Sequence, residues 1–341
     1  MQVMLQEDGF CCPMCKGALS FRENEYSCPA CSKKYPIILG IPDFRVFPDP
    51  YIDFEDDHKK AGHLAEQYHR LDFMGLVRLY WKMTPEVSEV RAERFIRRTV
   101  ALVEKGDECL SLIESLTEHE RLRGFNRVLE IGCGTGGFLV AAKRKYDHVV
   151  GADIAFRWLV VARKRLEELK LNIPLVCCCA EYLPFLDTRF DIILAEDVLE
   201  HVRSQESTLG ECRRVMTKQG TLFLATPNRF SLTPEPHVRV WGVGFLPRKW
   251  MNGYVKLVKG ISYQNIKVLS FMELRRLLNK CLLPNHCILL PSISNEEARY
   301  FSHVQRMQLT IYNVVKQIPA LRLILYVVGP YFNVVARADD K

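Results

Sequence analysis

The most constraining feature of this chain is a glycine-rich turn that ends an apolar run. Residues 128–137 read Val-Leu-Glu-Ile-Gly-Cys-Gly-Thr-Gly-Gly, and a helical pattern follows them. This order predicts a buried strand, a tight loop and a helix whose first turn faces a ligand. Glycines suit such a loop because a backbone without Cβ atoms can approach a bound molecule closely. The spacing Gly132-x-Gly134-x-x-Gly137 also fits the dinucleotide-binding fingerprint, which alone is a weak indication.

Two acids narrow the choice of ligand. Glu130 lies two residues before the first glycine, where a dinucleotide-binding strand normally continues with apolar residues. A carboxylate at that position suits a cationic ligand with amino or hydroxyl groups and disfavours a pyrophosphate. A second expected strand, residues 148–153, ends in Asp153, about 20 residues after the glycines, where an acid can accept hydrogen bonds from both ribose hydroxyls.

Two later segments add motifs of the same kind, each with an apolar run that predicts a strand. Cys-Ala-Glu-Tyr-Leu-Pro-Phe at 179–185 follows a third apolar run, and Phe-Asp-Ile-Ile-Leu-Ala-Glu at 190–196 reads as a fourth strand. With these motifs, residues 125–230 resemble the class I S-adenosylmethionine-dependent methyltransferases. The resemblance implies an α/β fold with a Rossmann-like sheet of seven strands, the last antiparallel. A dinucleotide-dependent oxidoreductase and a degenerate fold that binds without turnover are the alternatives.

The resemblance also implies contacts to the methionine and ribose parts of S-adenosylmethionine. Glu130 would meet the methionine amino end, Asp153 would hold the ribose, and Glu196 would close over the sulfonium side. The loop beneath the cofactor would consist of Gly132, Cys133, Gly134 and Gly136.

At the adenine end, the resemblance places Ile154 against the ring and the Ala180 backbone at its edge. Cys179 belongs to the same expected site. It is a departure from the pattern, because many members of the family carry an aspartate there that accepts from the adenine amino group.

The N-terminus carries a second motif, a pair of Cys-Pro-x-Cys elements. Cys12 and Cys15 form the first and Cys28 and Cys31 the second, with 12 residues between them. Two such elements can bring four thiolates into the tetrahedron that structural zinc requires. The segment 33–44 extends a resemblance to methyltransferase-activating zinc ribbons and to the ribbon of bacterial ribosomal-RNA guanine methyltransferases. A redox pair or unrelated buried cysteines are the alternatives, and the adjacent Cys11 could substitute as a ligand.

The distribution of charge and of turn-forming residues divides the chain into six parts. We expect a zinc ribbon at 1–47, a solvated acidic linker at 48–60, a helical cap at 61–124, the cofactor-binding core at 125–230, a basic and aromatic lid at 231–267, and a C-terminal completion of the domain at 268–341. The lid contains six basic and no acidic residues between His237 and Lys267, which suits an anionic, flat or lipidic acceptor or single-stranded nucleic acid. The alternative is a surface subdomain whose aromatic residues pack inward.

The C-terminal part should supply two paired antiparallel strands, at 286–291 and 331–337. Between them, the apolar segments 296–315 and 318–328 read as helices. We expect these helices to add to the core, although an amphipathic contact with a membrane also fits their composition.

For catalysis, His201 is the favoured general base, because it follows the fourth strand and titrates near neutral pH. Asp197-Val-Leu-Glu200-His201 also resembles the metal-binding loop of ubiquinone-pathway O-methyltransferases, which would place magnesium on Asp197, Glu200 and His201. A third possibility is that His201 only caps and packs its loop.

Together, these features predict a methyltransferase that modifies oxygen or nitrogen of a small or lipid-linked anionic acceptor. An RNA base methyltransferase and a catalytically silent cofactor-binding scaffold are the rivals. The ribbon speaks against RNA because residues 1–47 hold five basic and five acidic residues. The 13 cysteines, the absence of a secretory signal and the lack of a transmembrane run predict a cytoplasmic protein, whose oligomeric state the sequence leaves open.

Overall fold

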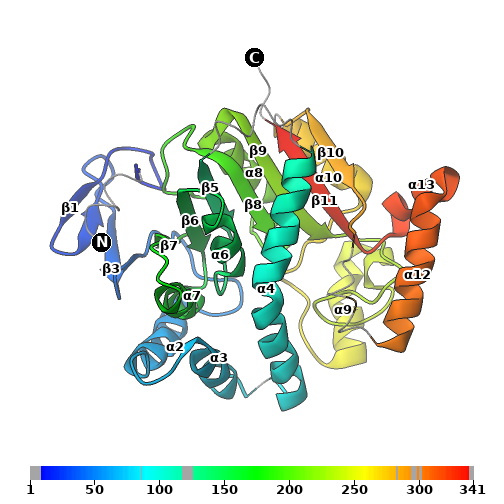
Figure 1. Cartoon of the computed structure of the whole chain (residues 1–341), viewed down its shortest axis with the longest axis horizontal. Helices are drawn as coiled ribbons and strands as arrows, with labels where there is room; N and C mark the ends of the chain where they lie inside the picture. Colours follow the sequence, from blue (N-terminus) through cyan, green and yellow to red (C-terminus); the bar gives the residue numbers. More distant parts are fainter. Residues whose placement is uncertain are drawn as a thin grey trace.

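The computed structural model describes residues 9–85, 87–116, 126–281, 283–292, 298 and 302–337. Its centre is a seven-stranded sheet in the order β10-β11-β9-β8-β5-β6-β7, visible face-on in Figure 1. The strands are β5 (Arg127–Ile131), β6 (His148–Asp153), β7 (Leu175–Cys177), β8 (Phe190–Glu196), β9 (Met216–Pro227), β10 (His286–Leu289) and β11 (Tyr331–Arg337).

The sheet confirms the Rossmann-like fold expected from the sequence. β7, β6, β5, β8 and β9 pair in parallel, whereas β11 runs antiparallel to both β9 and β10. The central strands read as near-continuous apolar runs because helices cover both faces of a parallel sheet. The parallel topology also brings the ends of β5, β6 and β8 to one edge, where ligands of such sheets bind.

Helices surround this sheet. They are α2 (Phe54–Glu66), α3 (Phe73–Lys82), α4 (Glu89–Leu116), α6 (Gly137–Lys143), α7 (Phe156–Glu168), α8 (Gln205–Val215), the 3₁₀ turn η1 (Val243–Phe245), α9 (Arg248–Lys259), α10 (Phe271–Lys280), α12 (His303–Gln317) and α13 (Pro319–Val328). The 28-residue α4 packs closely on α6, because a Cβ on Gly106 would lie 2.9 Å from the Ala141 side chain. Among the described residues, no helix combines the length and apolar character needed to cross a bilayer.

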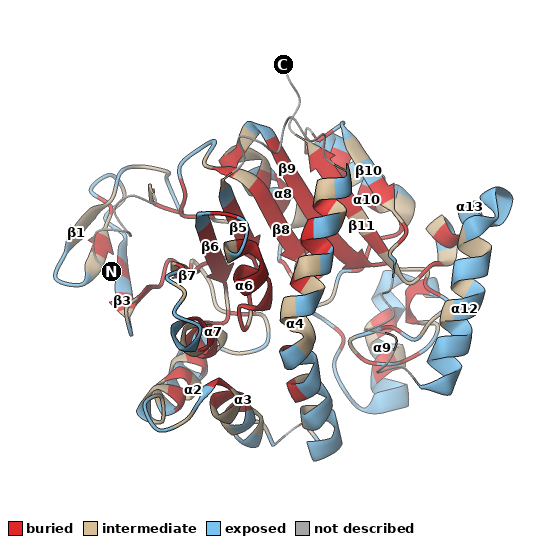
Figure 2. Cartoon of the chain, viewed as in Figure 1, coloured by how far each residue is buried: buried red, intermediate tan, exposed pale blue. Residues whose placement is uncertain are grey.

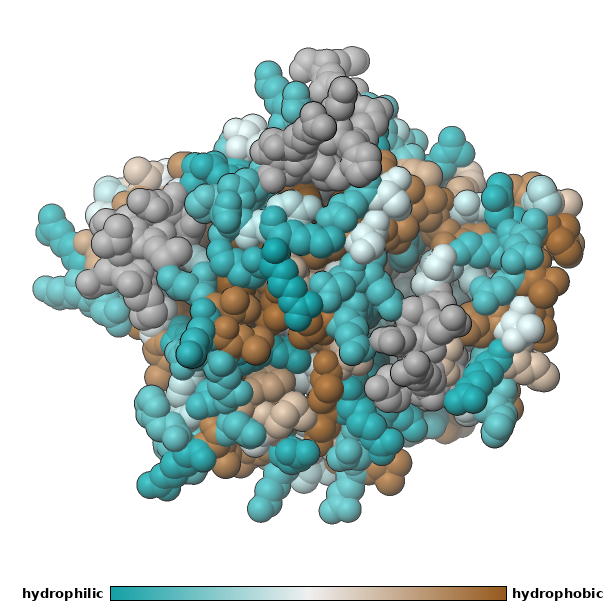
Figure 3. Space-filling model, in the orientation of Figure 1, coloured by the Kyte–Doolittle hydropathy of each residue, from teal (hydrophilic) through white to brown (hydrophobic). Residues whose placement is uncertain are grey.

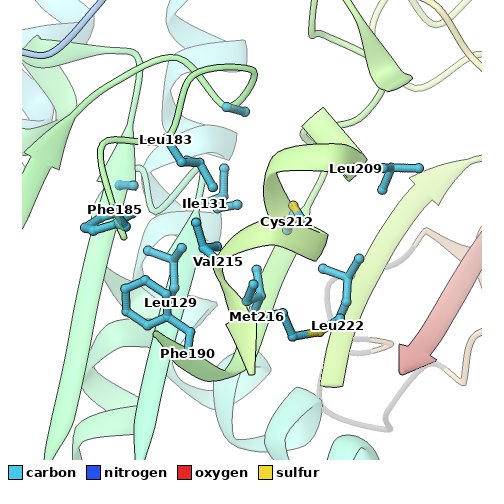
Figure 4. Packing of buried hydrophobic residues seen from close by; sticks show 14 of the residues in the cluster. Leu129, Ile131, Leu183, Phe185, Phe190, Leu209, Cys212, Val215, Met216 and Leu222 are labelled. Carbon is cyan, nitrogen blue, oxygen red and sulfur yellow. The ribbon is translucent and has the colours of Figure 1, made fainter. Parts of the chain in front are cut away.

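Buried side chains form a core on each face of the sheet, and Figure 2 shows this burial concentrated in the strands. On one face, Leu129 and Ile131 of β5 lie with Phe185 and Phe190, as Figure 4 shows. Met216 at the start of β9 lies in the same cluster and is fully buried. This packing fixes the strand ends that position the candidate site.

The N-terminal segment forms a four-stranded sheet of β1 (Ser20–Arg22), β2 (Glu25–Ser27), β3 (Lys34–Ile38) and β4 (Ile41–Pro42). It is fastened to the edge of the large sheet. The Phe44 amide donates to the Cys177 carbonyl at 2.8 Å, and Lys16 pairs with Glu211 at 2.6 Å. Because Phe10 also stacks against Phe185, this small sheet shares a core with the large one.

The expectation of a solvated linker at 48–60 is correct only in part. Asp57 has no exposed surface and receives Arg45 at 2.6 Å and Arg157 at 2.8 Å. Asp49 is also buried and accepts from Arg157 at 3.0 Å, and α2 begins within the segment. The other three acids, Asp53, Glu55 and Asp56, are exposed. The segment is thus anchored by a buried ion-pair network and is not a free linker.

The expectation that the C-terminal helices add to the core is also wrong. None of the 15 residues of α12 is buried, and α13 buries only Leu325. Both helices project from the end of the molecule opposite β1–β4 in Figure 1. Part of the segment predicted as the first helix, residues 296, 297 and 299–301, lies outside the described residues.

Candidate functional site

The glycine loop after β5 adopts backbone conformations that favour glycine. Gly132 and Gly134 have φ values of 77° and 48°, in the left-handed region. A Cβ on Gly132 would lie 2.4 Å from Val198, whereas one on Gly134 would enter open space. Gly134 therefore borders a hollow, and Gly132 allows the loop to pass under the segment that follows β8.

Asp153, at the end of β6, is fixed by the same loop. Its carboxylate oxygens accept from the amides of Gly134 and Ala155, each at 2.7 Å. Burial raises the pKa of the Asp153 carboxyl to about 6, although these amides oppose the shift. The side chain is held in one orientation and keeps further lone pairs for a ligand.

Glu130 provides an unsatisfied acid beside this aspartate. Its Oε2 is buried and has no hydrogen-bond partner among the described residues, and the same is true of Thr135 Oγ1. Burial, with contributions from Glu196 and Asp153, raises the pKa of the Glu130 carboxyl well above its ordinary value. Because buried polar atoms are normally paired, these two atoms indicate the place of a ligand.

Glu196 ends β8 and already has a protein partner. Lys105 Nζ, from α4, lies 3.0 Å from its Oε2. Burial would lower the pKa of Lys105, but Glu196 and Asp197 together raise it above its ordinary value. Lys105 was not foreseen in the sequence, because it lies in a helix far from every recognised motif.

The residues expected at the adenine are positioned by the segment after β4. The Ile154 carbonyl accepts from Arg45 Nη1 at 3.2 Å. The Cys179 thiol donates to the Phe47 carbonyl and accepts from the Val46 amide, each at 3.4 Å. The sulfur is thus used to anchor the chain, and the Cys179 carbonyl accepts from the Tyr182 amide at 3.0 Å. Cys133 likewise turns its sulfur toward Gly151 beneath the loop.

A second group of polar side chains gathers beyond β8 and β9. Tyr51 Oη lies 2.6 Å from His201 Nδ1, and His237 Nδ1 lies 2.5 Å from Glu235 Oε1. The two imidazole rings are perpendicular, with centroids 4.7 Å apart. Glu200 is fully buried beside them, and its Oε2 accepts from Thr226 at 3.1 Å. Its Oε1 has no hydrogen-bond partner among the described residues and lies 3.8 Å from His237 Nε2.

The surroundings of these three groups shift their pKa values in different directions. Burial lowers the pKa of His201 to about 4, with a further contribution from His237. Burial and Asp197 raise the pKa of Glu200 to about 8. Burial opposes the shift of His237, but the Glu235 carboxylate raises its pKa above the ordinary value. His201 is therefore neutral near pH 7.

The expected magnesium ligands are only partly brought together. Glu200 and His201 converge with His237, and their ligand atoms lie within 4.8 Å of one another. Asp197 does not join this group, so its expected place is taken by His237. Asp197 has a φ of 52°, and its amide donates to Ala225 at 2.9 Å.

A cavity of about 460 Å³ opens beside His201. It is bounded by the segment 48–53, by 201–203 and by Gln264, Asn265 and Lys267 of the expected lid. The lid is tied to the Glu200 loop, because the Lys267 amide donates to the Glu200 carbonyl at 2.7 Å. The former linker and the lid thus form opposite walls of one opening.

The expected lid has a small core of its own. Val240, Val243, Met251, Val255 and Tyr263 belong to it and are buried. Trp241, Phe245 and Trp250 remain exposed. The alternative of inward-packed aromatic residues therefore holds for Tyr263 and not for these three.

Four arginines meet at the base of the lid. Arg91, Arg94 and Arg98 recur at helical spacing on one face of α4, and Arg91 Nη2 donates to the His237 carbonyl at 3.4 Å. Burial and the charges of these three arginines lower the pKa of Arg239. Such a concentration of like charge favours an anionic ligand.

The paired cysteine elements converge as the sequence predicted. Cys12 Sγ lies 3.5 Å from Cys31 Sγ, and Cys15 Sγ lies 3.4 Å from Cys28 Sγ. All four sulfurs lie within 4.8 Å of one another. Cys11 does not join them, because its thiol donates to the Phe185 carbonyl at 3.1 Å.

Comparison with known proteins agrees with this geometry. A family model described as a methyltransferase domain matches residues 129–224. The ubiquinone biosynthesis O-methyltransferase of Coxiella burnetii is 37% identical over 103 residues, which cover 30% of this chain and 44% of that protein. The protein of the same name from Cereibacter sphaeroides is 38% identical over 103 residues, which cover 30% and 42%. The chain thus matches less than half the length of these curated relatives.

Solved structures with a similar arrangement include two methyltransferases. Phosphoethanolamine N-methyltransferase 2 of Haemonchus contortus, in complex with S-adenosyl-L-methionine, gives a TM-score of 0.45 at 15% identity, covering 68% of this chain and 52% of that one. A possible histamine N-methyltransferase of Thermotoga maritima gives 0.44 at 19%, covering 72% and 95%. Residues 129–224 thus match a methyltransferase-domain model and lie within a Rossmann-like sheet.

Proposed function

We propose that this protein transfers a methyl group from S-adenosylmethionine to oxygen or nitrogen of an anionic acceptor, which is small or lipid-linked. The observation that carries the proposal is the pairing of an unsatisfied buried Glu130 with a fixed Asp153 at the ends of adjacent strands. Glu130 suits an ammonium group and Asp153 suits a pair of hydroxyls. A dinucleotide would bring its pyrophosphate to this acidic loop, which Coulomb repulsion disfavours.

The residues present fit the proposed cofactor. Glu130 and Thr135 would receive its methionine end and Asp153 its ribose, while Gly134 leaves room for close approach. When bound, the cofactor supplies a sulfonium with an activated methyl group. The protein then has to align an acceptor atom and exclude water.

We assign the acceptor to the cavity beside His201. A neutral His201 can take a proton from an acceptor at Nε2 in the tautomer whose Nδ1–H donates to the Tyr51 oxygen. The bond to Tyr51 is compatible with this tautomer and with the one in which the tyrosine hydroxyl donates to Nδ1, and the role of a base requires the first. Nearby, the cluster of Arg91, Arg94, Arg98 and Arg239 would hold the anionic part of the acceptor.

A divalent cation is a second way to activate the acceptor, and one observation favours it. Both imidazoles use Nδ1 for hydrogen bonds, to Tyr51 and Glu235, which leaves each Nε2 available beside the unpartnered Glu200 Oε1. Histidine ligands of metals are commonly oriented in this way. A set with two imidazoles favours zinc, iron or nickel over magnesium.

For the N-terminal sheet we propose one structural zinc bound by Cys12, Cys15, Cys28 and Cys31. Elemental analysis should find one zinc per chain, and Cys28→Ser should lose it. Cys11→Ser is the matched control, because its sulfur points to Phe185, and it should keep the metal. Full zinc content in Cys28→Ser would refute this site.

The central proposal is tested by calorimetry with S-adenosylmethionine and NAD, in wild type and in Glu130→Gln. We expect the methyl donor to bind and the substitution to weaken it, because an ammonium loses its charged partner. Asp187→Asn, at an exposed acid far from the loop, serves as the control. Tighter binding of NAD than of the methyl donor would overturn the assignment.

The two modes of acceptor activation are separated by metal content and chelation. Incubation of lipid and RNA extracts with methyl-labelled S-adenosylmethionine, followed by fractionation, identifies the acceptor class. Label in lipid that persists after removal of all metal except the cysteine-bound zinc supports His201 as the base. Label that accumulates in RNA would favour the RNA methyltransferase instead.

A further inference from the structure

We propose that α9, α12 and α13 present a docking surface for membranes that contain anionic lipids. The surface is defined by six exposed apolar side chains: Trp250, Leu257, Met307, Ile311, Leu323 and Ile324. The inference rests on the proposed function, since it specifies a lipid-linked acceptor reached from the membrane. It concerns a part of the chain outside the matched methyltransferase domain.

The exposure of these side chains is large. Leu257 is 86% exposed, Leu323 67% and Trp250 58%. On α9, Trp250 and Leu257 are seven residues apart and so share one face. On α12, Met307 and Ile311 lie one turn apart, opposite Tyr312, which bonds to Pro291. Figure 3 shows apolar atoms gathered over the end of the molecule where α12 and α13 project. Exposed apolar groups that gather in this way mark interaction sites.

The charge of the same region is one-sided. Residues 237–337 contain 14 Lys and Arg but only three acids, whereas the rest of the chain carries 33 Lys and Arg and 37 acids. α9, α12 and α13 contain seven Lys and Arg and no Asp or Glu. Lys249, Lys256 and Lys259 are exposed on α9. Apolar and aromatic side chains mixed with cations are typical of helices that lie in an anionic membrane interface.

Hydrogen bonds join this surface to the acceptor site. The Leu232 amide donates to the Val328 carbonyl of α13 at 3.1 Å, and the Leu232 carbonyl accepts from Trp241 Nε1 of the lid at 3.0 Å. The Asn228 side chain donates to the carbonyls of Val327 and Gly329, both at 2.9 Å. The lid and α13 are therefore fastened to the loop that ends β9.

The chain then leads from α13 into the central sheet. Tyr331 follows α13 after two residues and starts β11. There it pairs with Pro227 at the end of β9, and the Asn228 amide donates to the Pro330 carbonyl at 3.0 Å. The surface is thus joined through the end of β9 to the segment that leads into the lid, and Lys267 of the lid lines the cavity beside His201.

The charge pattern favours a membrane over a second copy of this chain. α12 contains Arg306 and Lys316 but no Asp or Glu, so two copies joined through α12 would bring like charges close to one another. An anionic lipid surface supplies many negative groups without requiring a defined partner geometry. The apolar side chains would then enter the boundary between headgroups and acyl chains.

The test is co-sedimentation of the full chain with vesicles of phosphatidylcholine alone or with equimolar phosphatidylglycerol. We expect binding to the anionic vesicles that weakens with salt, and much less binding to phosphatidylcholine. Lys256→Glu with Lys259→Glu should lower the affinity by about fivefold or more for each lysine lost. Lys218→Glu, at an exposed lysine in β9, is the matched control and should bind like wild type.

A second pair of variants tests the apolar part. Leu257→Asp with Leu323→Asp should abolish vesicle binding, whereas Val90→Asp with Leu169→Asp, at exposed apolar positions elsewhere, should not. Equal binding of both pairs to anionic vesicles would overturn the proposal. So would a stable dimer in solution that Leu257→Asp with Leu323→Asp dissociates, because the surface would then bind a second copy.

Calorimetry with S-adenosylmethionine on the same samples tests the docking surface and the proposed function separately. Loss of vesicle binding with full cofactor binding in the Leu257→Asp, Leu323→Asp variant supports the docking surface. Wild type that binds anionic vesicles but no S-adenosylmethionine would refute the proposed function and leave the docking surface standing.

Discussion

The proposed cofactor groove, formed by Glu130, the glycine loop and Asp153, and the proposed acceptor site lie at the same edge of one sheet but are built in different ways. The groove takes Glu130, the glycine loop and Asp153 from a continuous stretch of about one strand-helix-strand unit, a local arrangement typical of such sheets. The acceptor site takes Tyr51, His201 and His237 from three separate segments. A ligand shared by a whole family can be held by a local motif, whereas a particular acceptor is met by elements added around it.

The two regions also differ in which groups orient their functional side chains. In the groove, Asp153 is held by two backbone amides, so its position depends on the loop alone. In the acceptor site, each imidazole is oriented by a side chain from another segment, Tyr51 or Glu235. Substitutions in the groove should therefore change cofactor affinity, and substitutions in the acceptor site should change turnover.

The largest expected effect is that of His201→Ala. Loss of a general base should lower the rate of methyl transfer by about 10²–10⁴-fold. The affinity for S-adenosylmethionine should stay unchanged, because no bond joins His201 to the glycine loop. The measurement is incorporation of labelled methyl into a lipid extract, with calorimetry for the cofactor. His63→Ala, on the exposed side of α2, is the control.

If His201→Ala weakened cofactor binding as much as it slowed transfer, the two regions would not be separable. An unchanged rate would leave His201 with the packing role that was its alternative. An unchanged rate would also argue against the divalent-cation hypothesis, in which His201 is one of three metal ligands.

The next effect is that of Asp153→Ala on cofactor affinity. Charge-assisted hydrogen bonds to a ribose should be lost at a cost of about 1.5–3 kcal/mol, which weakens binding roughly 10- to 150-fold. Part of this loss comes from the Gly134 and Ala155 amides, which lose their acceptor. Asp191→Ala, which removes an acid that also caps backbone amides away from the groove, tests whether a capping loss alone suffices. Equal affinity in wild type and Asp153→Ala would contradict a ribose contact.

A smaller effect is expected from pH. Burial raises the pKa of Asp153 to about 6, and a ribose is held best by the ionised carboxylate. Cofactor affinity should therefore be full above this pKa and should fall as the pH decreases through it, by about tenfold at pH ~5. Asp153→Asn should remove this part of the pH dependence in calorimetry. A pH profile identical in wild type and Asp153→Asn would assign the dependence to Glu130 or another group.

The fold could be predicted from the sequence because its signals are local, and the same local signals carry the proposal for the cofactor groove. Strand β5, its glycines and Asp153 follow one another within 26 residues, from Val128 to Asp153. The four cysteines could be paired for the same reason, since repeated elements at short range constrain one another. Apolar runs and turn residues were sufficient for the sheet.

The remaining features depend on contacts between distant segments. Lys105 was missed because nothing in α4 indicates that it faces Glu196. Asp49 and Asp57 were interpreted as solvated because their partners, Arg45 and Arg157, are recognised only once the chain is folded. The apolar residues of α12 and α13 indicated burial, but apolar patterning alone does not distinguish a core from an exposed surface.

The smallest effect, that of Tyr51→Phe, sharpens the comparison most directly. The substitution removes the hydroxyl 2.6 Å from His201 Nδ1 and retains the ring that packs edge-on against it. A single hydrogen bond contributes about 0.5–1.5 kcal/mol, so the rate of transfer should fall by roughly 2- to 10-fold without a change in cofactor affinity. Tyr254→Phe, which removes a 3.0 Å bond to Trp241 within the lid, is the matched control and should leave the rate of transfer near that of wild type. The double variant Tyr51→Phe, His201→Ala should be no slower than His201→Ala alone, because the hydroxyl acts only by orienting the imidazole. An additional loss in the double variant would show that Tyr51 acts on the acceptor independently, and the acceptor site would then contain two separate functional groups.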